Sequence, residues 1–128
     1  MNRLLDTCTF LWLIAGDPRL STASAQVIAD PANGCFLSAA SAWEIAVKFL
    51  AGKLPLPRSP DLLIPVERSL HRLDPLDLTE ADGLRVSNLP LLHKDPFDRM
   101  LICQALDRGL TILTPDADIR QYAVPTLW

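Results

Sequence analysis

Short, uninterrupted apolar runs alternate with longer helix-like segments along this chain, and this alternation restricts the fold more than any other feature. The runs expected to be strands are residues 3–5, 35–37 and 111–114, with weaker candidates at 75–78 and 124–128. None of these runs alternates between apolar and polar residues, so both faces of each strand must be covered. Buried strands separated by helices indicate an α/β protein with a mainly parallel sheet between helices.

The segments between the runs carry the start and stop signals of helices, which are a Ser, Thr or Asp before the segment and a Gly after it. The helices expected on this basis cover residues 7–14, 25–29, 41–50, 79–89 and 95–108. Residues 53–65 contain four prolines and predict a loop or a pair of short helices. Apolar residues continue through this segment, so it is not expected to link two domains.

The 128 residues, of which 49% are apolar, predict one domain over residues 1–128 with an ample core. No secretion leader and no apolar run of about 18 residues occurs, so we expect a cytoplasmic protein with no membrane contact. Cys8, Cys35 and Cys103 lie among apolar residues and lack a zinc-site spacing, which predicts reduced core thiols. The net charge of -3 argues against a module that binds nucleic acid by bulk positive charge.

Aspartate dominates the acids, with twelve Asp against three Glu. Asp6 directly follows the first predicted strand, and Asp116 lies two residues after the strand at 111–114. Glu44 and Asp98 lie in the first turns of two predicted helices. Because ligands collect at the carboxyl ends of parallel strands, these four acids can meet at one edge of the sheet. Such a cluster needs a cation or shared protons, and oxygen ligands suit Mg²⁺ or Mn²⁺.

Each of these acids also has an ordinary structural explanation. Asp6 can cap the helix that follows it, and Ser41 and Glu44 have the spacing of a capping box. Asp95 is the expected N-cap of the next helix, which leaves Asp98 in its first turn, where a carboxylate suits the helix dipole. Asp116 and Asp118 can be turn residues. The predicted metal site therefore depends on the joint placement of the four acids.

Several motifs of one known family occur in order along nearly the whole chain. They are Leu4-Leu5-Asp6-Thr7, Ser38-Ala-Ala-Ser41-Ala-Trp43-Glu44-Ile45 with Lys48, Gly52-Lys53-Leu54, Leu89-Pro90, His93-Lys-Asp95-Pro96-Phe97-Asp98-Arg99, Gln104-Ala105, Thr114-Pro-Asp116, and the stretch from Tyr122 to Trp128. The serine–tryptophan–glutamate motif followed by Asp-Pro-Phe-Asp-Arg is a specific pairing. On these residues the chain resembles the PIN domain family, and within it the VapC-type toxins of bacterial toxin–antitoxin pairs.

The resemblance implies a three-layer α/β/α PIN-like fold and a metal-dependent endoribonuclease. It places one or two Mg²⁺ or Mn²⁺ ions among Asp6, Glu44, Asp98 and Asp116, with Asp6 and Asp98 as the firmest ligands. The metal would deprotonate a water for in-line attack on an RNA phosphodiester. Members of the family usually form homodimers and are silenced by a cognate antitoxin. RNA, an antitoxin and a second copy of the chain are therefore the expected partners.

Two positions depart from the sub-group that the chain most resembles. A His commonly stands there at the position of Cys8, and another at the position of Asp82. Neither is one of the four acids. Cys8 can change a contact to substrate or to a metal ligand, and an acid at Asp82 near the groove would disfavour RNA phosphate. Asp82 also lies three residues after Thr79, as the partner in a capping box does.

Positive charge is concentrated in the middle of the chain. Residues 45–73 carry five Lys or Arg against two acids, and without the four candidate metal ligands the whole chain has a net charge of +1. We therefore expect the central segment, including Lys48, to contact phosphates, together with Arg99. Ser38 and Ser41 are candidates for hydrogen bonds to ligands or metal waters. Solvated helix faces are the ordinary explanation for the basic residues, and Arg99 can instead pair with Asp95.

Most of the tryptophan and histidine residues are expected to have structural and not catalytic roles. Trp43 is expected in the core, and Trp12 in the core or at an interface with a partner. His71 is expected at the surface, and His93 in a structural hydrogen bond near the site. Base stacking by the tryptophans is the functional alternative.

Other chemistries fit the sequence less well. An aspartyl phosphatase of the haloacid dehalogenase type needs an acid two residues after Asp6, where this chain has Cys8. A phosphoacceptor domain needs an acidic pair near the first strand, which is also absent. A catalytically weak PIN-fold module that acts by partner binding is the non-enzymatic alternative, and a nuclease acting on DNA is another.

Overall fold

A computed structural model describes all 128 residues and contains one sheet of five parallel strands. The strands are β1 (Asn2–Leu5), β2 (Gly34–Ser38), β3 (Leu73–Leu76), β4 (Thr111–Leu113) and β5 (Thr126–Leu127). Their order across the sheet is β3-β2-β1-β4-β5, and each neighbouring pair is parallel. The chain therefore leaves β1 toward one side for β2 and β3 and returns to its other side for β4. This arrangement makes the boundary between β1 and β4 a topological switch point, where ligands bind in sheets of this kind.

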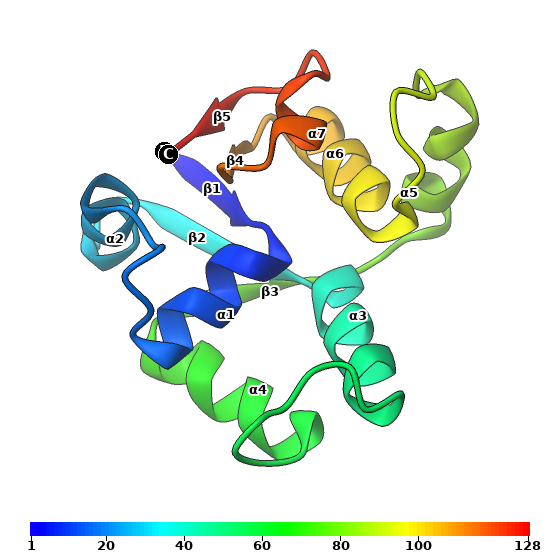
Figure 1. Cartoon of the computed structure of the whole chain (residues 1–128). Coiled ribbons are helices and arrows are strands. Elements are labelled where there is room, and N and C mark those ends of the chain that lie inside the picture. The colour runs from blue at the N-terminus through cyan, green and yellow to red at the C-terminus, as the bar shows by residue number, and fades with distance from the viewer.

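Side chains of the central strands alternate between two apolar clusters, one on each face of the sheet. Leu4 and Ile112 belong to the cluster under α6 and α7, whereas Leu5 and Leu113 belong to the cluster under α1, α2 and α4. The helices are α1 (Thr7–Ala15), α2 (Thr22–Ala29), α3 (Ala39–Leu50), α4 (Pro60–Leu70), α5 (Glu80–Arg85), α6 (Pro96–Arg108) and α7 (Ala117–Arg120), with a 3-10 turn η1 at Val86–Asn88 (Figure 1). The predicted three-layer fold with a parallel sheet is confirmed.

The helices differ from the sequence prediction in three places. Helix α3 begins at Ala39 and not at Ser41, because Ser38 is its N-cap and accepts from the N–H of Ala40 at 3.0 Å. Ser41 and Glu44 therefore do not form a capping box. Helix α4 begins within residues 53–65, for which a loop or a pair of short helices was predicted, and continues to Leu70; it begins at Pro60, where proline suits the first turn. The short helix α7 was not predicted.

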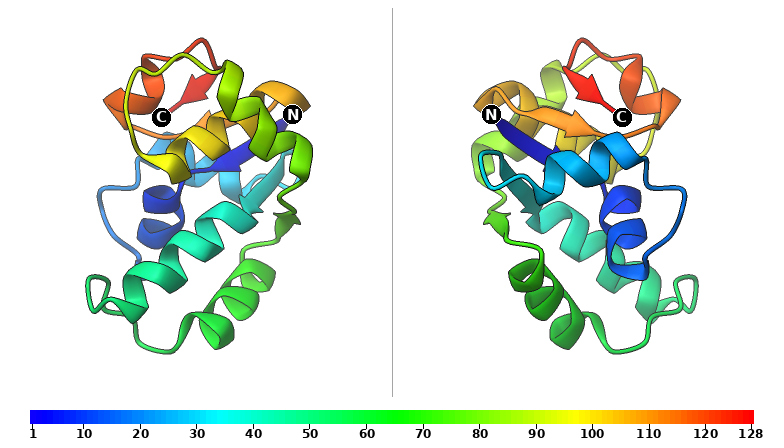
Figure 2. Two further views of the ribbon diagram at one scale, coloured as in Figure 1. Left: turned by 90° about the vertical axis from the view of Figure 1, so that its right-hand side faces the viewer. Right: turned by 90° about the vertical axis from the view of Figure 1, so that its left-hand side faces the viewer.

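Helices α3 and α4 extend together beyond the lower edge of the sheet, joined by the loop of residues 51–59 (Figure 2). None of the helices is both long and apolar enough to cross a membrane.

Gly109 ends helix α6 in the left-handed conformation, with φ of 63°. We expect Gly109→Ala to lower the free energy of unfolding by about 1 kcal/mol, because a Cβ is strained at this φ. Gly83 is the matched control, since it lies inside α5 with open space around its Cα, and Gly83→Ala is expected to stabilise the chain slightly. Urea unfolding of both variants measures the difference. Equal effects in the two would contradict the conformational argument.

Candidate metal-binding site

The candidate site lies at the carboxyl ends of β1 and β4, the two central strands at the switch point. Asp6 follows β1 directly, and Thr114 follows β4. The backbone N–H of Asp6 donates to the carbonyl of Leu113 at 3.4 Å, which extends the pairing of the two strands by one residue. Residues 108 positions apart in sequence therefore meet at this edge.

Asp6 is both the N-cap of α1 and the most deeply buried acid of the site. Its Oδ1 accepts from the N–H of Thr9 at 2.8 Å, and its Oδ2 accepts from the hydroxyl of Thr114 at 2.5 Å. The carboxylate is only 3% exposed, and burial raises its pKa, although the hydrogen bonds from Thr114 and Thr9 oppose the rise. The capping role and the candidate site role of Asp6 therefore coincide.

Glu44 reaches the site from the second turn of α3. Its Oε1 accepts from the hydroxyl of Thr7 at 2.6 Å, and its other oxygen pairs with Lys48 one turn later. The hydroxyl of Thr7 also lies 3.0 Å from that of Ser41. Because Thr7 has one proton and gives it to Glu44, Ser41 donates to Thr7 in return. Helices α1 and α3 are thus joined by hydrogen bonds that fix the Glu44 carboxylate.

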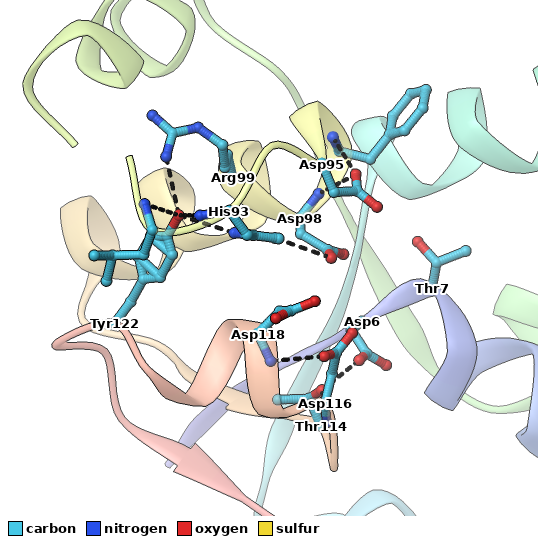
Figure 3. A network of polar contacts seen from close by, with 12 residues as sticks. Asp6, Thr7, His93, Asp95, Asp98, Arg99, Thr114, Asp116, Asp118 and Tyr122 are labelled. Carbon is cyan, nitrogen blue, oxygen red and sulfur yellow. Dashed lines mark hydrogen bonds and ion pairs between the residues drawn. The ribbon is translucent and has the colours of Figure 1, made fainter. Parts of the chain in front are cut away.

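Asp98 and Asp116 complete the set of acids. Asp98 lies in the first turn of α6 behind the N-cap Asp95, as predicted, and its Oδ2 is 3.3 Å from Nε2 of His93. Asp116 caps α7 by accepting from the N–H of Asp118 at 2.8 Å. In Figure 3 the carboxylate of Asp98 points toward Asp6 and Asp116, and the side chain of Asp118 points into the same space.

Burial, with a contribution from neighbouring acids, raises the pKa values of Asp6 and Asp98. Burial raises the pKa of Asp98 to about 8, helped by the negative charges of Asp95, Asp116, Glu44 and Asp6 in that order. The thiol of Cys8 is at the surface of this space, and partial burial and the charges of the four acids raise its pKa to about 11. The prediction that Cys8 is a core thiol was wrong, whereas Cys35 and Cys103 are buried. The site is therefore strongly negative and lacks a nearby free cation to neutralise it.

The chemistry of these donors fits a hard divalent cation. Carboxylates and hydroxyls from α1, α3, α6 and α7 are hard oxygen ligands, and burial together with neighbouring acids disfavours the ionised forms of Asp98 and Asp6 in the absence of a cation. No three acidic, histidine or cysteine groups lie close enough together to hold an ion by themselves. Direct contact with one or two carboxylates, with water between the ion and the others, is the usual way in which Mg²⁺ is held.

Two predicted substrate contacts, Ser38 and Arg99, are buried in structural roles. Ser38 is fully buried, caps α3 and donates to Oε1 of Gln104 at 2.5 Å. Arg99 donates to the carbonyls of Pro90 and Leu89 at 2.8 and 3.3 Å and to Tyr122. Ser38 thus holds the start of α3 and Arg99 holds the loop before α6, and neither side chain is exposed. Arg99 also does not pair with Asp95.

Ser41 and Lys48 have different positions. Ser41 is fully buried and touches the site only through Thr7, so it is not available to substrate. Lys48 is exposed on α3 while its ammonium group pairs with Glu44. It remains a candidate for phosphate contact at the rim of the site.

Asp82 and Trp43 also differ from prediction. Asp82 forms the expected capping box with Thr79, but it lies away from the groove and pairs with Arg108 at 2.7 and 2.9 Å. Trp43 is 60% exposed on α3 and packs edge-on against Phe97, with ring centroids 5.2 Å apart. An apolar helix suggested that Trp43 is buried, but α3 extends beyond the sheet, which leaves this face uncovered.

Three residues of the site were not singled out from the sequence for the roles they have here. Thr7 and Thr114 each bind a carboxylate, and Tyr122 binds both His93 and Arg99. A threonine directly after a strand-end aspartate was the available signal for Thr7. Tyr122 carried no local signal, because its partners lie 23 to 30 residues earlier in the chain.

Together the fold and the acids define a parallel α/β protein with acidic residues gathered at the switch point of its sheet. The model of the PIN domain family matches residues 3–125. The chain belongs to the PIN domain family. No curated protein matches the sequence.

Solved structures similar to the chain include complexes from three bacteria. VapBC2 of Rickettsia felis, bound to a DNA fragment from its promoter, matches with a TM-score of 0.75 and 15% identity, over 100% of this chain and 99% of that one. DNA-bound VapBC of Salmonella typhimurium matches with a TM-score of 0.70 and 19% identity, and VapBC-1 of nontypeable Haemophilus influenzae with 0.64 and 16%, each over 99% of this chain and 97% of that one. At these identities the likeness shows the shared fold.

Proposed function

We propose that this chain is a Mg²⁺- or Mn²⁺-dependent endoribonuclease and the toxin of a toxin–antitoxin pair. The observation that carries the proposal is the convergence of Asp6, Glu44, Asp98 and Asp116 at the switch point of a PIN-domain sheet. A bound divalent ion would supply a water of lowered pKa and a counter-charge for the phosphodiester. Asp6 and Asp98 would hold the ion most directly, and Glu44 and Asp116 would act partly through water.

The surface beside the acids supplies positive charge for RNA. Lys48 lies on α3 one turn from Glu44, and Lys53 and Arg58 are exposed farther along, in the loop of residues 51–59. These residues form a basic flank to a negative site, so the phosphate backbone would be attracted to the flank while the ion neutralises the acids. The net charge of -3 is compatible with an RNA substrate for this reason.

Exposed apolar residues on α3 and α4 support a protein partner. Leu62, Val66 and Leu70 recur every four residues on α4 and are all more than half exposed, and Trp43 and Leu50 are exposed on α3. A cognate antitoxin would cover these residues. We also propose a cytoplasmic homodimer, in which a second copy would cover the exposed leucines Leu84, Leu91 and Leu92.

RNA cleavage by the pure protein tests the proposed activity. Single-stranded RNA and DNA oligonucleotides are incubated with Mg²⁺, with Mn²⁺ or with EDTA, and the products are separated by size. We expect RNA cleavage with metal and none with EDTA. Asp6→Asn is expected to lower the rate of RNA cleavage by at least about a hundredfold. Loss of a residue that only orients a metal ligand already lowers activity by up to about a hundredfold, and loss of the ligand itself should cost no less. Asparagine caps helices as well as aspartate does, so α1 should remain folded.

Asp74→Asn is the matched control, because Asp74 is an exposed acid near the start of β3, at the opposite end of the sheet from the site. Its rate should equal that of the wild type. Equal rates for wild type and Asp6→Asn would contradict the site assignment, and DNA cleavage alone would contradict the substrate. Absence of all cleavage together with tight binding of an antitoxin would favour a catalytically weak PIN-fold module that acts by partner binding.

A further inference from the structure

The hydroxyl of Tyr122 is the centre of a polar network behind Asp98 (Figure 3). Arg99 Nη1 lies 2.9 Å from this oxygen, and the backbone N–H groups of Leu92 and His93 approach it at 3.3 and 3.2 Å. The ring nitrogen Nδ1 of His93 is the nearest neighbour, at 2.8 Å. Tyr122 itself is buried between α7 and the loop before α6.

Counting hydrogens in this network determines which nitrogen of His93 is protonated. The guanidinium of Arg99 and the two backbone N–H groups can only donate, so the lone pairs of the Tyr122 oxygen are shared among these three donors. A hydroxyl has two lone pairs and a single proton, so this oxygen has no capacity to accept from a fourth donor. Its own proton must therefore point to Nδ1 of His93. His93 is thereby fixed as the neutral tautomer that carries its proton on Nε2.

The protonated Nε2 of this tautomer faces the candidate metal ligand Asp98, at 3.3 Å from Oδ2. We propose that His93 is a positioning residue whose Nε2–H holds one oxygen of Asp98, so that the other oxygen is presented to the divalent ion. Tyr122 and Arg99 act through His93 by setting its tautomer. A neutral imidazole orients the carboxylate without placing a positive charge that would compete with the ion. This role rests on the proposed function, in which Asp98 is a ligand.

The tautomer is tested by ¹⁵N NMR of the full-length protein without metal. Long-range correlation of ring protons to ring nitrogens distinguishes a protonated from an unprotonated nitrogen. The chain has only two histidines, and His71→Gln identifies the signal of His93. We expect an unprotonated Nδ1 and a protonated Nε2, and a change toward a mixture of tautomers in Tyr122→Phe. A protonated Nδ1 in the wild type would overturn the proposal.

The positioning role is tested by Mn²⁺ binding in a calorimeter, without RNA. His93→Leu removes the donor to Asp98, and we expect it to weaken Mn²⁺ binding by about tenfold or more. His93→Gln is the conservative control, because its amide can place an N–H where Nε2 lies, and it should bind Mn²⁺ nearly as tightly as the wild type. Thermal melting confirms that both variants are folded. Equal affinities in the two variants, or no binding by the wild type, would overturn the positioning role.

Failure of this inference can be told apart from failure of the proposed nuclease activity. If His93→Leu loses Mn²⁺ while no RNA is cut by the wild type, the positioning role stands and the nuclease assignment is wrong. If RNA is cut and His93→Leu binds Mn²⁺ as the wild type does, the nuclease assignment stands and the positioning role is wrong.

Discussion

Asp98→Asn will stabilise the metal-free protein at pH 8 and at the same time abolish its response to Mg²⁺. Asparagine keeps the shape of the side chain and can still accept from His93, but it removes one charge from a cluster of acids. Because burial and the neighbouring acids raise the pKa of Asp98 to about 8, ionising this residue in the folded state is unfavourable. Asp98→Asn removes this unfavourable ionisation and, at the same time, removes a candidate metal ligand.

The sign of the pH dependence follows from the two states of Asp98. Its pKa is about 8 in the folded protein against 3.8 for an ordinary aspartate, so the folded state retains a proton that the unfolded state has released. The free energy of unfolding of the metal-free wild type should therefore fall as pH rises from about 4 to about 8. In Asp98→Asn this fall should be much smaller, with a remainder from Asp6, whose pKa is also raised.

Thermal melts at pH 5, 7 and 8, with and without Mg²⁺, measure both effects. The wild type should gain most from Mg²⁺ at pH 8, because the ion binds only the ionised site and the folded state. The variant should melt higher than the wild type at pH 8 without metal, by a smaller margin at pH 5, and show no gain from Mg²⁺. A lower melting temperature of the variant at pH 8 would contradict the repulsion among the acids.

Among single charge removals, Asp82→Asn is expected to cause the largest decrease in the free energy of unfolding. The Asp82 carboxylate is 2% exposed and accepts from both Nη atoms of Arg108, from the N–H of Thr79 and, at 3.4 Å, from Gln104. Breaking a buried pair costs about 3–5 kcal/mol, and the partial exposure of Arg108 reduces this to about 2 kcal/mol. Urea unfolding at pH 7 measures the loss.

The pH dependence gives a second check on Asp82. The hydrogen bonds from Arg108 lower the pKa of Asp82 to about 2, so its contribution is complete above about pH 4 and is lost as pH falls toward 2. The gap between wild type and Asp82→Asn should therefore close in acid. Asp107→Asn is the matched control, because Asp107 pairs with Arg85 at the surface and should cost less than about 1 kcal/mol.

Asp82→Asn also tests whether Asp82 has a role in metal binding in addition to its role in stability. Arg108 lies ten residues after Asp98 on α6, about 15 Å along the helix, so Mn²⁺ affinity should be unchanged. A weakened Mn²⁺ affinity in this variant would show that Asp82 acts at the groove, as the sequence first suggested.

The parallel direction of the central strands followed from the sequence, because β1, β2 and β4 are short apolar runs between helices, whereas their order across the sheet was not predicted. Strand β3 was placed two residues late, since Asp74 and Pro75 in Leu73–Leu76 interrupt the apolar pattern. Helix α4 was missed as one unit because Pro65 lies inside it. In each case packing against neighbouring elements outweighed the local signal.

The four acids could be named from the sequence, but their supporting contacts could not. Asp6 could be placed because it directly follows a predicted strand. Asp98 could be placed in the first turn of a helix because it follows the predicted N-cap. The partners that orient them, Thr114 and His93 with Tyr122, depend on which elements pack together. The same limit explains why the exposure of Trp43 and the burial of Arg99 were not predicted. A helical pattern in the sequence does not say which face of the helix the rest of the protein covers.

The hydrogen bond between Thr114 and Asp6 has a consequence for the time at which the candidate site assembles during synthesis. Asp6 is made 108 residues before Thr114. Asp116 follows, and β5 is added after it. A nascent chain therefore has no assembled carboxylate cluster until the segment through Asp116 has left the ribosome. For a nuclease of RNA, late assembly would keep the growing chain from cutting the message that encodes it.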